Sequence, residues 1–449
     1  MTEPPQKGFK NSYTFIFCFF YLIQGLYNGL QYIVLPIWLI DIVKTVDLSA
    51  IIGIFAITSM PWSVKFLIGL INDKYGSERF GRRFPWIFCF GILAGTSFIV
   101  TGIGIPLQST SLVITFAVLG ALFWNIGIAF ADTALDGLIL DVTPKEELGK
   151  VQGYTWSLNM FGNGAGGIIL GAIFFLIDAV PLLFVLEGLL LIISCSFPYF
   201  IQETELPEDI KVWTDLKNIV NKRKNWKVFL FTLLDNIPYN ILTVAFGLLV
   251  LIYMPNSPIS AEVTTIQLMG ESLELFTFYS ILGAINGVGI IIGSIIGGKL
   301  ADKRRKMAVY VGNLMYIPFF LISAVFIGSL WLGVIMMVIL GAGQGAVKAA
   351  YQSVRGDIAK KYPKLKSTYY ALLISFLNGG AVVGMGITAI LLPTFAGIFK
   401  EFVFIYFCIM IVMSIFQICS FLVFRTIDEE EYEFEEYLTT QNKVNIKNE

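Results

Sequence analysis

Long apolar stretches alternate with short polar segments along almost the whole chain. Because a helix needs about 20 mostly apolar residues to cross the hydrocarbon core of a bilayer, each long stretch predicts one membrane-spanning helix. The twelve expected helices cover residues 13–38, 48–71, 85–105, 110–138, 150–177, 180–201, 227–254, 273–299, 306–327, 330–355, 366–393 and 400–424. The pattern therefore predicts an all-α, multi-pass membrane protein.

One longer polar segment separates the first six predicted helices from the last six. It covers residues 202–226, is acidic at first and ends near the basic cluster Lys222-Arg223-Lys224. We interpret it as a cytoplasmic linker between an N-terminal half at 1–201 and a C-terminal half at 227–424. The remaining residues, 425–449, are acidic and then polar, a composition that predicts a flexible cytoplasmic tail.

The positive charges favour one orientation in the membrane. With both termini inside, the predicted outer loops contain Lys44 and Lys400 and no other lysine or arginine. Basic residues collect on the cytoplasmic side of membrane proteins. Both termini are therefore expected in the cytoplasm, and the cell membrane is the expected location.

Two basic loops repeat the same pattern, Gly-x-x-x-Asp followed by basic residues, once in each half. A glycine near a helix end allows close helix approach, and the aspartate is placed to pair with the arginines. We therefore expect these loops to form ion pairs that gate the inner face. Their residues are Gly69, Asp73, Arg82 and Arg83 in the first half and Gly298, Asp302, Arg304 and Arg305 in the second.

This repeated loop resembles the motif of the major facilitator superfamily, which joins the second and third helices and recurs between the eighth and ninth. The Pro-Trp-x-x-Lys segment at 61–65 and Gly-Arg-Arg at 81–83 are similar to folate-biopterin transporters, acetyl-CoA transporters and muropeptide permeases. Pro-Trp-Ile at 85–87 also resembles the sugar–cation symporters. The resemblance implies two pseudo-symmetric six-helix halves around a central substrate site, with alternating access.

Polar residues inside the predicted helices recur at helical spacing, so each set shares one face. Polar groups are costly in hydrocarbon and face the bundle interior or water, and the resemblance assigns these faces to the substrate path. For the neutral residues the alternative is interhelical hydrogen bonding. The candidate substrate and coupling residues are Gln24, Asn28, Lys65, Asn125, Asp132, Asp136, Asn159, Asp235, Tyr239, Gln344, Lys348 and Asn378.

Lys65 lies deep within the second predicted helix and needs a partner there. Asp132 and Asp136 lie at similar depth in the fourth predicted helix, so we expect a Lys65–Asp132 ion pair. Such a pair could be static, or it could act as a gate or anion site during transport. Asp136 and Arg355 are also related by the constant offset that relates the fourth helix to the tenth, which indicates an internal duplication.

Composition excludes several classes of function. The chain is 56% hydrophobic and carries a net charge of −1, which gives no general attraction to nucleic acid. It has no histidine, the commonest metal ligand and proton carrier, so proton coupling would use carboxylates. The sequence has no nucleotide-binding P-loop, no metal-ligand pattern and no nucleophile–base pair, so neither an enzyme nor a cofactor is expected.

The sequence thus predicts a monomeric secondary active transporter for a small polar solute that is either anionic or sugar-like. A symporter is the expected class, while antiport and uniport stay open, as do H⁺ and Na⁺ as coupling ions. The alternatives are a lipid or lysolipid transporter and a transport-inactive receptor or scaffold of the same fold.

Overall fold

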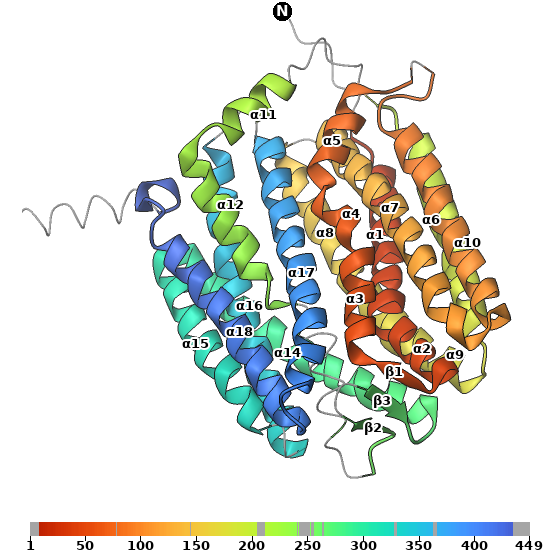
Figure 1. Ribbon diagram of the computed structural model, residues 1–449. Helices are drawn as coiled ribbons and strands as arrows, with labels where there is room; N and C mark the ends of the chain where they lie inside the picture. The colour runs from red at the N-terminus through yellow and green to blue at the C-terminus, as the bar shows by residue number, and fades with distance from the viewer. Residues whose placement is uncertain are drawn as a thin grey trace, which may run out of the picture. The chain divides into compact units, whose positions relative to one another are not determined.

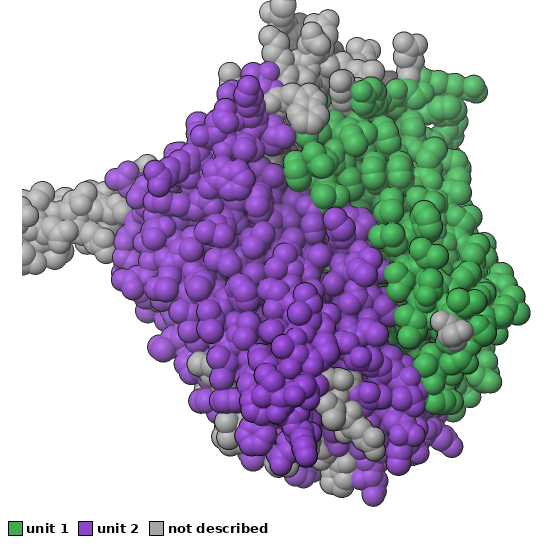
Figure 2. Space-filling model, viewed as in Figure 1, with its two compact units in different colours: residues 1–44, 64–210 green, residues 45–63, 211–449 purple. Residues whose placement is uncertain are grey.

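The computed structural model describes residues 9–77, 79–143, 145–203, 212–239, 241, 252, 256–262, 265–326, 330–361 and 366–433. The chain forms two compact units, which Figure 2 distinguishes by colour. Unit 1 contains residues 1–44 and 64–210, and unit 2 contains residues 45–63 and 211–449. The boundary between residues 210 and 211 falls inside the predicted linker at 202–226.

The labelled elements of unit 1 are all helices (Figure 1), and its first basic loop contains one isolated β-bridge, between Ser77 and Gly81. The elements of unit 1 are α1 (Asn11–Gly29), the π-helical η1 (Leu30–Val34), α2 (Leu35–Val43), α5 (Lys65–Lys74), α6 (Phe84–Gly104), η2 (Ile105–Leu107), α7 (Thr110–Val142), α8 (Lys145–Gly164), η3 (Ala165–Leu170), α9 (Gly171–Leu176), α10 (Val180–Ser196) and η4 (Phe197–Phe200). Helices α6 and α10 carry proline in the first turn, at Pro85 and Pro181, where the missing N–H costs nothing.

Glycine and aromatic residues hold the helices of unit 1 together. A Cβ added at Gly29 of α1 would lie 2.2 Å from the backbone nitrogen of Gly167, so the two backbones are in contact there. The rings of Phe98 and Trp124 stack with their centroids 4.2 Å apart. Close backbone approach of this kind is how helices associate in a membrane.

Unit 2 consists of helices and one small sheet. Its first helix, α3, begins at a capping residue, since Asp47 accepts a hydrogen bond from the backbone of Ser49 at 2.8 Å. The elements are β1 (Thr45–Asp47), α3 (Leu48–Thr58), α4 (Met60–Ser63), α11 (Val212–Val220), α12 (Arg223–Asn236), β2 (Ile259–Glu262), β3 (Thr265–Leu268), α14 (Ser272–Lys303), α15 (Arg305–Phe326), α16 (Leu330–Lys360), α17 (Lys366–Ala396), α18 (Phe402–Phe424) and η6 (Glu429–Glu431).

Nine helical stretches within the described residues are long and apolar enough to cross a membrane. They cover residues 11–43, 84–107, 112–139, 158–176, 180–200, 272–301, 331–359, 369–396 and 402–424. Among the other predicted spans, 48–71 is divided into α3, α4 and α5, and much of 227–254 lies outside the described residues. The protein is therefore an all-helical, multi-pass membrane protein in its spanning part.

The predicted helix at 48–71 is interrupted, and its first part belongs to unit 2. Helix α3 packs on α17, and Asn378 donates a hydrogen bond to the carbonyl of Trp62 at 3.2 Å. The interruption follows from Pro61, which has no N–H to continue the ladder of backbone hydrogen bonds. The apolar pattern predicts one continuous helix over 48–71, and this prediction is wrong.

A three-stranded antiparallel sheet in unit 2 was not predicted. Its strand order is β1-β3-β2, with Val46 opposite Ile266 and Ala261 also opposite Ile266. The strands have only three or four residues each, too short for an alternating pattern to indicate them. The sheet connects the segment before α3 to the segment before α14.

The tail also differs from expectation in its first residues. Residues 425–433 fold back in unit 2, where Ile427 and Tyr432 are buried. The ring of Tyr432 packs 5.0 Å from that of Phe424, and burial beside Glu429 and Glu433 raises the pKa of its hydroxyl. A flexible tail was predicted from residue 425, and residues 434–449 lie outside the described part of the chain.

Candidate functional site

Three charged residues meet between α5 and α7 of unit 1. The ammonium of Lys65 contacts the Oδ2 atom of Asp132 and lies 2.9 Å from Oδ2 of Asp136. The two aspartates are one helical turn apart on α7 and so share a face. The predicted Lys65–Asp132 ion pair is confirmed as a contact, and Asp136 is a second partner. We call these three residues the acidic cluster.

Neutral residues of α1 and α8 complete the hydrogen bonds of the acidic cluster. Gln24 donates to Oδ1 of Asp132 at 2.8 Å, and Asn159 donates to Gln24 at 3.0 Å. Tyr21, which the sequence analysis did not select, donates its hydroxyl to Oδ1 of Asp136. Each carboxylate therefore has both a charged and a neutral donor.

A second hydrogen-bonded group lies nearer the N-terminus of α7 than the acidic cluster. Asn125 accepts from the hydroxyl of Tyr27 at 2.6 Å and donates to Gln31 at 2.9 Å. The indole of Trp124 donates to the same Gln31 oxygen at 2.8 Å. Asn125 and Gln31 are fully buried, which fits interhelical hydrogen bonding, whereas Asn28 on α1 is half-buried.

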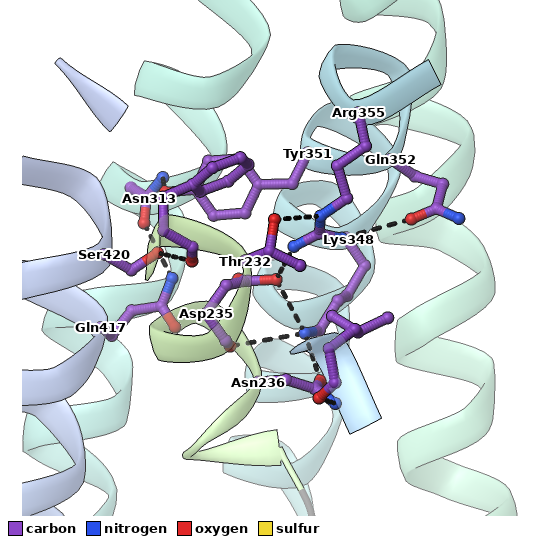
Figure 3. Close-up of polar contacts among 12 residues, drawn as sticks. Thr232, Asp235, Asn236, Asn313, Lys348, Tyr351, Gln352, Arg355, Gln417 and Ser420 are labelled. Carbon is purple, nitrogen blue, oxygen red and sulfur yellow. Dashed lines mark hydrogen bonds and ion pairs between the residues drawn. The ribbon is translucent and has the colours of Figure 1, made fainter. Parts of the chain in front are cut away.

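Unit 2 contains a charged cluster of opposite composition (Figure 3). Oδ2 of Asp235 on α12 lies 3.0 Å from the ammonium of Lys348 and 2.6 Å from the guanidinium of Arg355, both on α16. Lys348 also donates to Asn236 at 2.6 Å. We call Asp235, Lys348 and Arg355 the basic cluster.

The two cations of the basic cluster are not equivalent. The side chain of Arg355 is fully buried and also donates to Thr232 and Gln352, at 3.3 Å and 3.2 Å. The side chain of Lys348 is 25% exposed, and its ammonium lies 5.0 Å from the ring centroid of Tyr239, within the range of a cation–π contact. Lys348 is thus the more accessible cation.

Two further predicted residues lie on α16 and α17. Gln344, one turn before Lys348, is 2% exposed, and neither polar atom of its amide has a hydrogen-bond partner within the described residues. The side-chain amide of Asn378 donates its hydrogen bond to the carbonyl of Trp62, where the predicted helix at 48–71 is interrupted. Arg355 was noticed only through the internal duplication, although its spacing of seven residues from Lys348 places both on one face of α16.

The first basic loop is held by two carboxylates that the sequence analysis missed. Arg82 and Arg83 donate to Asp141 of α7 at 2.5 Å and 3.1 Å. Glu203 accepts the backbone N–H groups of Arg82, Arg83 and Phe84 at 2.6–3.0 Å, which caps the N-terminus of α6. Gly81 has a positive φ of 83°, and a Cβ there would lie 2.6 Å from the Glu203 carboxylate carbon.

The second basic loop repeats this arrangement within unit 2. Arg305 donates to Asp357 of α16 at 2.7 Å. Glu433 accepts the backbone N–H groups of Arg305 and Lys306 at 3.2 Å and 3.0 Å, which caps α15. Glu203 and Glu433 each lie far along the chain from the helix that they cap, and this is why local sequence patterns did not indicate them.

The other predicted loop residues contribute less to this geometry. A Cβ added at Gly69 would meet Thr133 of α7 at 3.6 Å, an ordinary contact, and one at Gly298 would meet nothing within 4 Å. The backbone of Arg304 donates to Leu300 at 2.8 Å. The side chains of Asp73 and Asp302 lie outside the described part of the structure.

The family model of the Major Facilitator Superfamily matches residues 263–438 of the chain. The model of the BT1 family matches residues 24–254, more than half of the chain, and the chain belongs to this family.

Two curated relatives share part of their length with this chain. The putative transporter AmpG 1 of Rickettsia conorii is 28% identical over 269 residues, 57% of this chain and 61% of that protein. The probable folate-biopterin transporter 4 of Arabidopsis thaliana is 24% identical over 198 residues, 42% of this chain and 39% of that protein. In both cases the match spans less than two thirds of the relative.

Solved transporter structures share the fold at low sequence identity. The nucleoside transporter NupG gives a TM-score of 0.65 at 12% identity, covering 93% of this chain and 100% of that one. A D-xylose–proton symporter gives 0.62 at 14% identity, covering 90% and 96%. A bacterial homolog of the human lysosomal transporter Spinster, in an inward-facing and occupied conformation, gives 0.62 at 16%, covering 94% and 97%.

Proposed function

We propose that this protein is a secondary active transporter that moves a small polar solute, anionic or sugar-like, by alternating access between two six-helix halves. The observation that carries the proposal is a buried charged cluster in each unit, built from residues within the helices. Ionisable residues are costly at membrane depth and mark substrate and ion pathways. A purely structural role would not need two clusters of different composition.

The capped basic loops support a gating role near the predicted cytoplasmic ends of the helices. Arginine–carboxylate pairs hold the start of α6 and of α15 to the last turns of α7 and α16. Pairs at such partly exposed sites contribute modestly to stability, so they can break and re-form during a transport cycle. Asp73 and Asp302 are proposed to act with them.

The topology follows the charge distribution. We place both termini and the linker in the cytoplasm, with twelve helices in the cell membrane and the monomer as the working unit. H⁺ or Na⁺ would be coupled through the acidic cluster, since its carboxylates are the ionisable groups of unit 1 that lie within reach of Lys65.

Reconstituted liposomes provide the test. Purified protein is assayed for uptake of radiolabelled folate, biopterin, a nucleoside, D-xylose and glucuronate, each under an imposed proton or sodium gradient, with protein-free liposomes as control. We expect saturable, protein-dependent uptake of at least one solute. Binding without flux would instead indicate a receptor of this fold, and movement of labelled lysolipid alone would indicate a lipid transporter.

A further inference from the structure

The acidic and basic clusters carry opposite formal charges. The acidic cluster has one lysine and two carboxylates, a net charge of −1. The basic cluster has one carboxylate shared by a lysine and an arginine, a net charge of +1. A net charge among membrane-spanning helices is unfavourable, so each cluster favours a ligand of the opposite sign.

In the acidic cluster the accessible carboxylate is Asp136. Its side chain is 39% exposed, against 5% for Asp132 and 12% for Lys65. The charged and titratable groups that face it are Tyr21 from α1, Lys65 from α5 and Asp132 from its own helix. Each carboxylate also has one neutral donor, Gln24 for Asp132 and Tyr21 for Asp136. Because Asp132 is buried, the greater exposure of Asp136 makes it the better placed of the two carboxylates to gain and lose a ligand.

A proton fits the acidic cluster better than a metal cation. The ammonium of Lys65 already lies between the two carboxylates, and a second cation there would be repelled. The described residues contain no group of three or more Asp, Glu, Cys or His side chains that could hold a metal. A proton adds no new charge centre, because it bonds to a carboxylate oxygen and leaves a neutral acid.

In the basic cluster the accessible group is Lys348. Arg355 is fully buried and bound to Asp235, Thr232 and Gln352, whereas a quarter of the Lys348 side chain is exposed. One turn away, the buried amide of Gln344 offers a donor and an acceptor that are unpaired among the described residues. Lys348 with Gln344 would suit a carboxylate or phosphate that is followed by a hydrogen-bonding group.

We propose that the transporter separates its two ligands by charge: Asp136 takes the coupling proton, and Lys348 with Gln344 binds an anionic group of the solute. This inference rests on the proposed transport function. The proton bonds to a carboxylate oxygen of Asp136, Lys65 stays paired with Asp132, and no bond of the solute breaks. With one proton and one anionic group bound, each cluster becomes formally neutral.

The solute side is tested with matched pairs of anionic and neutral compounds: folate with biopterin, and glucuronate with glucose. Thermal stabilisation of the purified protein measures binding without requiring transport. We expect at least tenfold tighter binding of the anionic member of a pair, and we expect Lys348→Gln to abolish this preference. Lys44→Gln is the control, because Lys44 belongs to unit 1 and forms an exposed ion pair with Asp41 of the same unit. Equal binding of both members, or an unchanged preference in Lys348→Gln, overturns the solute assignment.

The proton side is tested in liposomes with a pH dye inside. Wild-type protein should accumulate the anionic solute under an inward proton gradient and acidify the lumen, whereas a sodium gradient should have no effect. Asp136→Asn should still exchange labelled for unlabelled solute but lose accumulation by at least tenfold, and Asp41→Asn should behave as wild type. Proton-driven accumulation in Asp136→Asn, or sodium-driven accumulation in the wild type, overturns the proton assignment.

The outcomes separate this inference from the transport proposal. If the wild type exchanges solute but shows neither anion preference nor proton movement, transport stands and the separation by charge is wrong. If the wild type binds the anionic compounds through Lys348 but never moves them, the transport proposal fails instead. Should Asp136→Asn not fold, solute-induced proton uptake by the detergent-purified wild type gives the same decision, because its absence contradicts the proposal.

Discussion

Lys65 lies between two carboxylates. Removing Lys65 and removing one of the carboxylates should therefore have different effects on stability. Without Lys65, Asp132 and Asp136 would face each other as like charges one helical turn apart. Without Asp132, Lys65 would keep Asp136 as a partner. The three positions should therefore differ in their tolerance of substitution, although all three belong to one cluster.

Lys65→Ala should lower the free energy of unfolding by about 3–5 kcal/mol, the cost of leaving buried charge unpaired. Asp132→Ala should cost less, because Asp136 still neutralises Lys65, and the double variant should be more stable than Lys65→Ala alone. Thermal unfolding of the detergent-purified proteins measures the order. Equal losses for Lys65→Ala and Asp132→Ala would show that Asp136 does not neutralise Lys65.

The residues of the acidic cluster could be predicted in part because the depth of each charged residue within its own helix can be read from the sequence. A lysine deep in an apolar helix needs a partner, and the fourth predicted helix offered two carboxylates at similar depth. The contacts of Asp235 with both Lys348 and Arg355 depend on how α12 packs on α16, which helical periodicity does not specify. Tyr21 escaped notice because a tyrosine in an apolar run has the same pattern as a core aromatic residue.

Among the helices, close packing depends on which side of each helix carries glycine. On α8, a Cβ added at Gly162 would lie 2.2 Å from the carbonyl oxygen of Leu22 on α1, whereas one at Gly164 would meet nothing within 4 Å. Both glycines lie in the fifth predicted helix, 150–177, which also contains Gly166, Gly167 and Gly171. So many small residues favour close helix packing, but the sequence does not show which of the glycines make it.

Gly162→Ala should therefore push α1 away from α8. We expect it to lower the free energy of unfolding by about 1–3 kcal/mol, which is typical of overpacking, and so to reduce the yield of folded protein. Gly164→Ala, two residues away, should be neutral or slightly stabilising, since alanine favours helix more than glycine does. Size-exclusion profiles and melting temperatures of the two variants measure the difference. A stable Gly162→Ala protein would contradict the close crossing.

The distant caps of α6 and α15 are a second feature at the scale of helices. Apolar periodicity predicted these helices within a few residues, but it did not predict the carboxylates that cap their N-termini. A capping carboxylate more than a hundred residues away in the chain leaves no local sequence pattern, unlike Asp47, which lies next to α3.

Glu203→Ala should destabilise unit 1 by about 1–2 kcal/mol, the usual cost of losing a helix cap, because three backbone N–H groups lose their acceptor. Glu401→Ala is the matched control: Glu401 stands at the N-terminus of α18 without a capping hydrogen bond from its side chain. Hydrogen exchange at the first turn of α6 reads the effect directly. Unchanged protection there in Glu203→Ala would rule out the cap.

For the molecule as a whole, the class of fold could be predicted from the sequence. The length of the apolar stretches and the uneven distribution of Lys and Arg between the predicted loops can be read along the entire chain. The sheet of β1, β3 and β2 could not be predicted in this way, because its strands pair residues 45–47 with residues more than two hundred positions further on. The interruption of the helix at 48–71 has a local cause in Pro61, but the length of an apolar stretch does not reveal it.

Labelling from outside intact cells tests the proposed topology. Lys222→Cys should stay unlabelled by a membrane-impermeant maleimide until the cells are opened, because Lys222 belongs to the predicted cytoplasmic linker. Lys400→Cys, in a predicted outer loop, should react at once, and the unsubstituted protein reports any reaction of its own cysteines. Ready labelling of Lys222→Cys in sealed cells would reverse the orientation.

The cap that Glu433 supplies to α15 has a practical consequence for protein production. Residues 425–433 lie beyond the last membrane-spanning stretch, so the chain could be shortened to end at Phe424 without touching any spanning helix. The shortened chain would lose the carboxylate that binds the N–H groups of Arg305 and Lys306. We expect a chain that stops after Phe424 to melt earlier than one that stops after Glu433, which fluorescence-detected melting would measure. An affinity tag should therefore follow Glu433 rather than replace it.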